Sequence, residues 1–315
     1  MTKVRSLIFG FILTTASLNS NAQSQPYHLF SYFVGNGEDG LHLAWSADGF
    51  TWKALNDGKS ILKPTAGKDK LMRDPSILQG EDGTYHMVWT VSWGEKGIGY
   101  SSSRDLITWT AQRYLPVMEH EPSAKNCWAP ELFYDEALGQ YLIIWSTTIP
   151  GRFPEGEEQK YNHRLYYVTT RDFVTFSRAK LLYDKKFSVI DAAIVKDGGQ
   201  YVMFLKDETD KPNKPEKNIR IATSAKAEGP YSDAGNPITG DYWAEGPAPV
   251  RVNGRWFVYF DKYTQHKYGV VVSADLKTWV DESDKLSMPS GVRHGTVFSV
   301  NEPAMEKLWQ RFGGR

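Results

Sequence analysis

Short apolar runs alternate with polar, glycine-bearing turns along most of the chain, whereas a helical spacing of apolar residues is confined to residues 302–312. Runs of this length, bounded by turn residues, are typical of β-strands. Four strand–turn–strand units are predicted, at residues 76–78 and 85–91, 132–134 and 141–146, 192–195 and 201–205, and 250–252 and 256–261. With a first unit at residues 27–55, the pattern predicts five repeats and an all-β fold.

Most repeats also carry a turn that ends on an aromatic residue. The segments are Ser46-Ala-Asp-Gly-Phe-Thr-Trp52, Ser103-Arg-Asp-Leu-Ile-Thr-Trp109, Thr170-Arg-Asp-Phe-Val-Thr-Phe176 and Ser273-Ala-Asp-Leu-Lys-Thr-Trp279, with a weaker form at residues 224–231. The Asp side chain can accept hydrogen bonds from nearby backbone N–H groups and fix the turn. These turns resemble the Asp-containing boxes of sialidase propellers, although they are one residue shorter, and we assign them a structural role.

About four short antiparallel strands per repeat make one blade of a β-propeller. The chain is therefore predicted to form a single five-bladed propeller over residues 23–315. The first repeat lacks an innermost strand, and residues 294–300 form a strand with no blade of its own. We expect this last strand to pair with the first blade and close the ring, which also removes exposed sheet edges.

Residues 1–22 read as a secretory signal. Lys3 and Arg5 supply a positive start, residues 7–13 form an apolar run, and a small-residue cleavage site ends at Ala22. The apolar run is shorter than the roughly 18 residues of a membrane span. We therefore expect cleavage there and a periplasmic or secreted protein without a membrane span.

Composition narrows the expected partners. The chain has 37 Lys and Arg against 37 Asp and Glu and no basic stripe, so nucleic acid is not an expected partner. The single cysteine, Cys127, excludes intrachain disulfides and is predicted to be buried packing rather than a nucleophile. Aromatic residues make up 14% of the chain, which fits either ordinary strand composition or exposed rings that stack on sugars.

Three carboxylates fall at equivalent places in the repeats. When the repeats are aligned on the aromatic residue that opens the second strand, the positions 10 or 11 residues earlier are Asp74, Pro130, Asp191 and Glu245. The closing strand adds His294. Because the innermost strands of a propeller line its channel, these five positions are predicted to form a ring around the channel mouth. Clustered carboxylates repel one another, so packing is a poor explanation for them.

Glycoside hydrolysis requires such a set of carboxyl groups. One must carry a proton for the leaving oxygen, and another must be ionised to activate water or attack the sugar. A third can orient the acid and hold its pKa up. Taken alone, each of the three residues could cap a turn or lie in solvent as an ordinary charge, but the joint pattern favours a catalytic trio.

The motifs in these repeats resemble glycoside hydrolase family 43. They are Asp74-Pro75, Trp128-Ala-Pro-Glu131, Ile190-Asp191, Glu245-Gly-Pro247 and Arg293-His294-Gly-Thr-Val297, within residues 27–300. The resemblance implies an inverting hydrolase in which Asp74 is the general base, Asp191 the pKa modulator and Glu245 the general acid. Inversion places base and acid about 6.5–9.5 Å apart. A whole repeat precedes the Asp-Pro blade, unlike in many members, so the N-terminal segment carries no inference about substrate.

Six further residues are candidates for substrate binding. Arg73 and Arg293 could hold carboxylates ionised or bind sugar hydroxyls, with surface ion pairs as the alternative. His294 is predicted to face the channel, where related enzymes can hold a structural calcium ion or its water shell; a hydrogen-bonded structural histidine is the alternative. No cofactor is required by the predicted reaction. The rings predicted to stack on sugar, unless they pack in the core, are Trp93, Trp128 and Trp243.

Long loops at residues 149–163 and 207–217 are predicted to wall the site. They favour a pocket over an open groove, and hence exo action on a terminal sugar. The resemblance implies pentosides of plant-type polysaccharide, α-L-arabinofuranosides or β-xylosides, with galactosides as an alternative. Two other interpretations stay open: a retaining fructan- or sucrose-cleaving hydrolase, whose Asn-Asp-Pro-Asn-Gly motif is missing, and a carbohydrate-binding propeller without catalysis.

Overall fold

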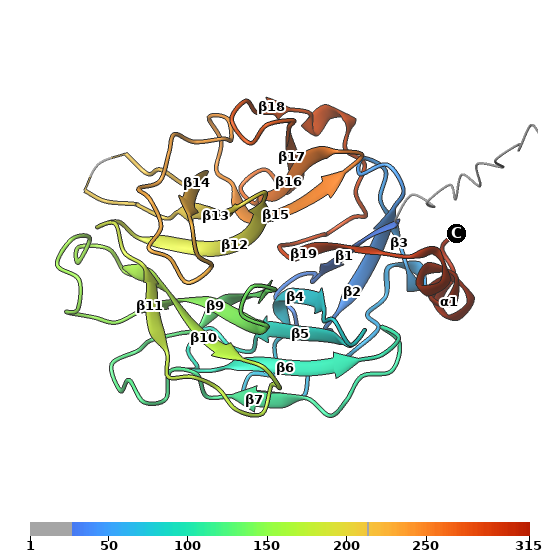
Figure 1. The fold of residues 1–315 in the computed structure, drawn as a ribbon, viewed down its shortest axis with the longest axis horizontal. Helices are drawn as coiled ribbons and strands as arrows, with labels where there is room; N and C mark the ends of the chain where they lie inside the picture. The colour runs from blue at the N-terminus through green and yellow to red at the C-terminus, as the bar shows by residue number, and fades with distance from the viewer. Residues whose placement is uncertain (1–26, 213) are drawn as a thin grey trace, which may run out of the picture.

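The computed structural model describes residues 27–212 and 214–315, which form five antiparallel sheets around a common centre (Figure 1). The innermost strands of the five sheets contact one another in a ring, in the order β4, β8, β12, β15 and β19 and back to β4. The prediction of an all-β, five-bladed propeller is confirmed. By sheet, the strands are β19 (Thr296–Val300), β1 (Tyr27–Tyr32), β2 (His42–Ser46) and β3 (Lys53–Ala54); β4 (Arg73–Gln79), β5 (Tyr85–Thr90), β6 (Ile98–Ser103) and β7 (Arg113–Leu115); β8 (Trp128–Asp135), β9 (Gln140–Thr148), β10 (His163–Thr170) and β11 (Lys180–Tyr183); β12 (Val189–Asp197), β13 (Gln200–Asp207) and β14 (Asn218–Ser224); and β15 (Glu245–Val252), β16 (Arg255–Lys262), β17 (Lys267–Ser273) and β18 (Val280–Asp281).

The two ends of the described chain close the ring. Strand β19 pairs antiparallel with β1, from Tyr27 opposite Val300 to Ser31 opposite Thr296. The predicted closing strand is therefore present, although it begins at residue 296 rather than 294. Closure gives the first blade its innermost strand and leaves β1 without a free edge.

The fourth blade differs from the expectation of four strands. Among the described residues its sheet contains three strands, β12, β13 and β14. The segment after β14 still covers the outer edge, because the N–H groups of Ser232 and Gly235 donate to the carbonyls of Thr223 and Ile221, at 2.8 and 2.9 Å. The backbone groups of the edge are thus satisfied without a regular fourth strand.

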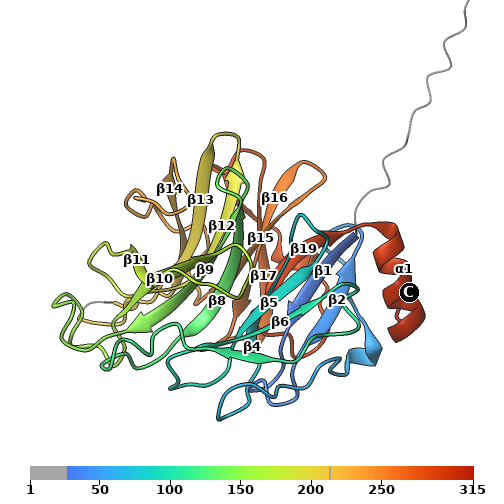
Figure 2. The ribbon, with the colours of Figure 1, turned by 60° about the horizontal axis from the view of Figure 1, so that its bottom comes forward.

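The hydrophobic core is divided into layers between neighbouring blades. Trp89, on β5, and Trp145, on β9, are both completely buried in two such layers. The one α-helix of the described residues, α1 (Glu302–Phe312), lies on the outside of the first blade (Figure 2). Its Trp309 ring meets the Trp45 ring edge to face, with centroids 5.0 Å apart. The helix predicted at residues 302–312 is confirmed with the same bounds.

The aspartate turns have the structural role expected of them. The Oδ1 atom of Asp105 accepts hydrogen bonds from the N–H groups of Ile107 and Thr108, at 2.9 and 2.7 Å. The same pair of bonds recurs at Asp48, Asp172 and Asp275. Each turn fixes the step from the third strand of a blade toward its outer edge.

Cys127 is buried, as predicted, and burial raises the pKa of its thiol, which keeps it unreactive. No helix within residues 27–212 and 214–315 is long and apolar enough to cross a membrane. The secretory signal expected at residues 1–22 lies outside the described residues.

Candidate active site

Four inner strands carry a β-bulge near their first residue. The pairing registers shift between Arg73 and Ser76, Trp128 and Glu131, Ile190 and Ala193, and Glu245 and Ala248. The residue after the first member of each pair has a positive φ, at Asp74 (52°), Ala129 (47°), Asp191 (54°) and Gly246 (63°). A bulge bends the strand and re-aims side chains, so each strand presents two consecutive residues to the channel mouth.

These bulges correct the alignment made from the sequence. Glu245 pairs with Asp261 in the same way as Arg73 pairs with Thr90, so Glu245 lies level with Arg73 and one residue before the position of Asp74. Counting back from the aromatic residue assumes that every blade has the same number of residues between the channel mouth and that aromatic residue. The spacing from the residue with positive φ to the aromatic residue varies between blades by up to two residues, so the count placed Pro130 one residue after the equivalent Ala129 and Glu245 one residue before the equivalent Gly246.

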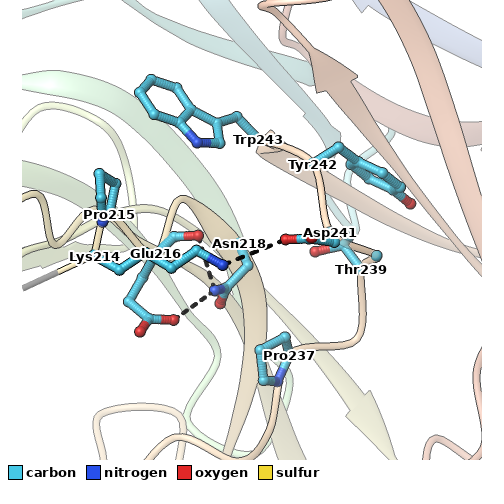
Figure 3. A pocket seen from close by; sticks show the side chains of 10 residues that line it. Lys214, Pro215, Glu216, Asn218, Pro237, Thr239, Asp241, Tyr242 and Trp243 are labelled. Atoms are coloured by element: carbon cyan, nitrogen blue, oxygen red, sulfur yellow. Dashed lines mark hydrogen bonds and ion pairs between the residues drawn. The ribbon is translucent and has the colours of Figure 1, made fainter.

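The bulge residues line a cavity of about 160 Å³ at the channel mouth, with the exception of Gly246. Eight of the nine residues predicted to form the site line this cavity, together with Thr90, Ala129 and Ile190. Trp243 lines a different cavity, of about 380 Å³, with Lys214, Glu216 and Asp241 (Figure 3). The Trp243 ring lies 5.9 Å from that of Tyr263, outside the first cavity.

Asp74 is held as a carboxylate. Its Oδ2 accepts a hydrogen bond from the Thr90 hydroxyl at 2.8 Å, and its Oδ1 lies 3.4 Å from Nδ1 of His294. Burial alone would raise the pKa of Asp74, but the contact and positive charge of His294, with the charge of Arg73, outweigh burial and lower it. An ionised carboxylate at the cavity can accept a proton from water.

Asp191 holds a proton more easily than Asp74. Burial raises the pKa of Asp191 to about 6, because the positive charges of His294 and Lys206 only partly offset burial and the repulsion from Glu245 and Asp74. Its Oδ2 accepts a hydrogen bond from the backbone N–H of Gly246 at 3.0 Å. The left-handed conformation of Gly246 directs this N–H toward Asp191, next to Glu245.

His294 connects the two aspartates and carries a positive charge. Its Nδ1 lies 3.4 Å from Asp74 and 4.0 Å from Asp191. Burial would lower the pKa of His294, but the two aspartates outweigh burial and raise it to about 9.

The residues around His294 do not fit the calcium ion that the family resemblance allows. The described residues contain no group of three or more His, Cys, Asp and Glu side chains arranged to hold a metal, and calcium takes oxygen ligands rather than an imidazole nitrogen. Glu131, which also interacts electrostatically with His294, accepts a hydrogen bond from the Thr296 hydroxyl at 3.0 Å. We derive no step through a metal ion.

Glu245 lies between two cations. Its Oε1 accepts from the Arg293 guanidinium at 3.2 Å, and its Oε2 accepts from Nζ of Lys206 at 3.1 Å. Arg293 also donates through Nε to Asp261. Arg293 therefore bridges two carboxylates and holds the Glu245 side chain against the cavity.

The aromatic rings of Trp93 and Trp128 also line the cavity. The Arg73 guanidinium lies 4.3 Å from the centre of the Trp93 ring and 4.6 Å from that of Phe33. Asn36 fixes this wall, because its Oδ1 accepts hydrogen bonds from Arg73 and from the Trp93 indole, both at 3.0 Å. Half of the Trp93 side chain stays exposed, as a ring that stacks on sugar requires.

The sequence analysis missed three residues that position the site: Asn36, Thr90 and Asp261. Thr90 and Asp261 share one signal with Lys206, because each ends, or nearly ends, the second strand of its blade, opposite the first or second residue of the inner strand. Asn36 lies in a glycine-rich turn of the first blade and carries no such signal.

The two long loops expected to wall the cavity lie elsewhere. In the described part of the chain, no residue of 149–163 or 207–217 lines the cavity. The loops meet each other instead, where the N–H of Asp210 donates to Oε1 of Gln159 at 2.8 Å. Tyr161 packs behind Trp128, with ring centroids 4.9 Å apart, so one loop supports the wall from outside.

The fold and the sequence both resemble known glycosidases. An α-L-arabinofuranosidase of Bifidobacterium longum subsp. longum is 29% identical over 54% of this chain, and the chain spans 18% of that relative. A solved α-L-arabinanase of Cellvibrio cellulosa has a TM-score of 0.59 at 15% identity, covering 87% of this chain and 96% of its own. An α-L-arabinofuranosidase of Lactobacillus brevis has a TM-score of 0.54 at 19% identity, covering 67% and 72%.

A family model related to glycoside hydrolase family 43, described as a probable glycosyl hydrolase domain, matches residues 25–306. This match covers most of the chain, and the chain belongs to that family.

Proposed function

We propose that this protein is an inverting glycoside hydrolase that removes terminal pentosyl residues, arabinofuranosyl or xylosyl, from oligosaccharides or polysaccharide side chains. The observation that carries the proposal is the unequal environment of three carboxyl groups on one small cavity. Asp74 is stabilised as a carboxylate, whereas Asp191 has a raised pKa beside Glu245. Groups whose environments push their pKa values apart are typical of acid–base catalysis. The curated relative supports the choice of sugar.

In the proposed reaction, Asp74 takes a proton from a water molecule as the water oxygen attacks the anomeric carbon. The bond from that carbon to the leaving oxygen breaks, and Glu245 gives its proton to the leaving oxygen. Asp191 lies beside both residues and, through the Gly246 N–H, keeps the start of β15 in place. Only these side chains and water take part, and the separation of 6.5–9.5 Å between base and acid stays a prediction.

Exo action fits the size of the cavity. A volume of about 160 Å³ is well below the roughly 300–1,000 Å³ of sites for drug-sized ligands, so it suits a single sugar ring. A larger cavity, of about 600 Å³, adjoins it and shares Arg293 as a wall. We assign the leaving part of the substrate to this space, because Arg293, which lines it, contacts Glu245. The signal-like residues 1–22 support export to the periplasm or the medium.

A panel of p-nitrophenyl glycosides, with the first product followed by proton NMR, tests the proposal. Release of arabinose or xylose with inverted configuration is the expected result. A retained anomer would instead favour the fructan-type mechanism and remove Asp74 from the role of base. Cleavage of a long polysaccharide without a monosaccharide product would contradict exo action. A preference for galactosides would show that the substrate is a galactoside rather than a pentoside.

A carbohydrate-binding propeller without catalysis is the second candidate, favoured only by the exposed rings at the cavity mouth. The substitution Glu245→Gln separates the two candidates. If the protein is a glycoside hydrolase, turnover by Glu245→Gln falls by about 10²–10⁴-fold while affinity for the sugar product persists. If wild type binds sugar and turns over none of the panel, the binding function is the correct one.

A further inference from the structure

A row of alternating charges runs behind the cavity and passes through Glu245. Lys206 lies between two carboxylates, with Nζ 3.1 Å from Oε2 of Glu245 and 2.6 Å from Oε2 of Glu208. Glu208 is held in turn by Lys217 at 2.8 Å, and Glu245 by Arg293 at 3.2 Å. The proposed mechanism uses Glu245 alone, so the row behind it has no role yet.

Lys206 is the residue of this row whose burial needs an explanation. Its side chain is only 2% exposed, and an isolated buried ammonium would cost several kcal/mol. Burial would lower the pKa of Lys206, but Glu245 and Glu208 outweigh burial and raise it well above the usual value. The Tyr263 ring, 4.7 Å from Nζ, covers the ammonium. The lysine is therefore a fixed positive charge rather than a side chain that samples solvent.

We propose that Lys206 is the positioning residue of the proton donor: it fixes the Glu245 carboxyl and stabilises the carboxylate that forms as the proton leaves, while Glu208 holds Lys206 in place. The inference rests on the proposed function, because it takes Glu245 as the general acid. A cation at 3.1 Å interacts more strongly with the ionised than with the neutral carboxyl. The interaction thus grows during proton transfer, and such a change lowers the barrier.

Other charged groups also face Glu245. Arg293 binds the other oxygen, Asp261 lies beyond Arg293, and Asp191 and His294 lie on the cavity side. Lys206 is the cation that contacts Oε2 among the described residues. The two cations share the carboxylate between them, so removing Lys206 leaves one oxygen of Glu245 without its ionic partner.

The dependence of the rate on the leaving group tests this role. A sugar or methanol leaves only with a proton, whereas a 2,4-dinitrophenolate leaves without one. The substitution Lys206→Met is expected to reduce kcat on the methyl glycoside at least 30-fold and on the dinitrophenyl glycoside less than about threefold. Lys206→Arg should recover much of the loss. Lys196→Met, an exposed lysine on β12 far from the row, serves as the matched control and should change neither rate.

An equal loss on both substrates would overturn the inference, since a distorted cavity affects both leaving groups. The variant Glu208→Gln provides a second test if Lys206→Met folds poorly, because it keeps the lysine and removes its support. It should show the same leaving-group dependence in weaker form. Equal rates for Glu208→Gln and wild type would count against the inference.

A double-mutant cycle separates failure of the inference from failure of the proposed function. The unfolding equilibrium constants of Lys206→Met, Glu245→Gln and the double variant are compared in urea. Non-additivity of tenfold or more is expected, because each single variant removes one direct ionic partner of the other residue. Additivity within about twofold would overturn the inference. If wild type hydrolyses no glycoside at all, the proposed function fails, and the cycle alone decides whether Lys206 holds Glu245.

Discussion

Two of the three carboxylates are placed by an uncommon backbone conformation. Asp74 and Asp191 have φ values of 52° and 54°, in the left-handed region that few non-glycine residues adopt. Aspartate tolerates this region better than most residues. The conformation turns each carboxylate out of its strand and toward His294, which lies within 4.0 Å of both. The strained backbone of the two aspartates therefore serves to bring their carboxylates to His294.

Gly246 is the fourth residue with this conformation, after Asp74, Ala129 and Asp191, and its replacement should damage the site. A Cβ atom at Gly246 would lie 2.4 Å from the His294 ring, and its φ of 63° is strained for alanine. Gly246→Ala is expected to cost about 1–3 kcal/mol of stability and to reduce kcat/KM at least tenfold. Gly254→Ala is the control, because its φ is 80° but nothing lies within 4 Å of the added atom. It should lose stability in urea unfolding and keep its kcat/KM.

The charge of His294 should make stability depend on pH. Its pKa is about 9 in the folded state against about 6.5 in the unfolded chain, so its contribution is complete below pH 6.5 and lost as the pH rises through 9. The full contribution is at most about 3 kcal/mol. Urea unfolding at pH 6, 7.5 and 9 should therefore show a steeper fall for wild type than for His294→Gln. Parallel curves over this range would contradict the charged histidine.

At the scale of elements, the same aspartate turn occurs in four of the blades. Each Asp side chain accepts two backbone N–H groups, and the residue after it takes a positive φ, at Gly49, Leu106, Phe173 and Leu276. In the fourth blade Lys226 stands where the Asp would be, and the N–H of Lys226 donates only to the Ser224 hydroxyl. The turn closes there without the carboxylate.

Replacing one of these aspartates should affect stability and leave catalysis intact. Asp105→Ala removes the acceptor of the Ile107 and Thr108 N–H groups, at an expected cost of about 1–3 kcal/mol. The matched control is Lys226→Ala, at the same place in the fourth blade, which should change stability by less than about 0.5 kcal/mol. Thermal unfolding and kcat/KM measure the two effects. A loss of activity in folded Asp105→Ala protein would give the turn a role beyond structure.

At the scale of the whole molecule, the ring holds together because β19 and α1 return to the first blade. His294 lies two residues before β19, and it lines the cavity. The pairing of β19 with β1 that closes the ring therefore also completes the site. Helix α1 covers the outer side of the same blade, away from the channel (Figure 1). Its Met305 and Leu308 are completely buried in the layer that contains Trp89.

Truncation of the helix core should therefore separate stability from activity. Leu308→Ala is expected to lower the free energy of unfolding by about 2–5 kcal/mol, because it opens a cavity in a closed layer. At temperatures where the variant is folded, kcat/KM should equal that of wild type. Leu138→Ala, at a side chain that is 52% exposed, is the control and should change neither quantity. A parallel loss of kcat/KM in Leu308→Ala would couple the outer layer to the site.

The sequence by itself determined the architecture of the described chain. Strand spacing, the repeated turns and the helical segment at 302–312 are local patterns, and they predicted five blades, closure by the last strand and the terminal helix. The same repeats brought Asp74, Asp191 and Glu245 to one end of the channel, because positions of the blades that are equivalent to within one residue face the same axis. Within this architecture, the expectation of four strands in the fourth blade was wrong.

The tertiary structure alone decided how the site is assembled. The bulges that set Glu245 one residue before the level of Asp74 and Asp191 depend on pairing with a second strand, which residue types do not reveal. The partners Lys206 and Asp261 act through contacts of about 3 Å between blades or strands distant in sequence. Trp243 is only two residues from Glu245 yet faces another cavity. Patterns of neighbouring residues can be read along the chain, whereas the direction of a side chain and its ionic partners depend on residues that only the closed ring brings together.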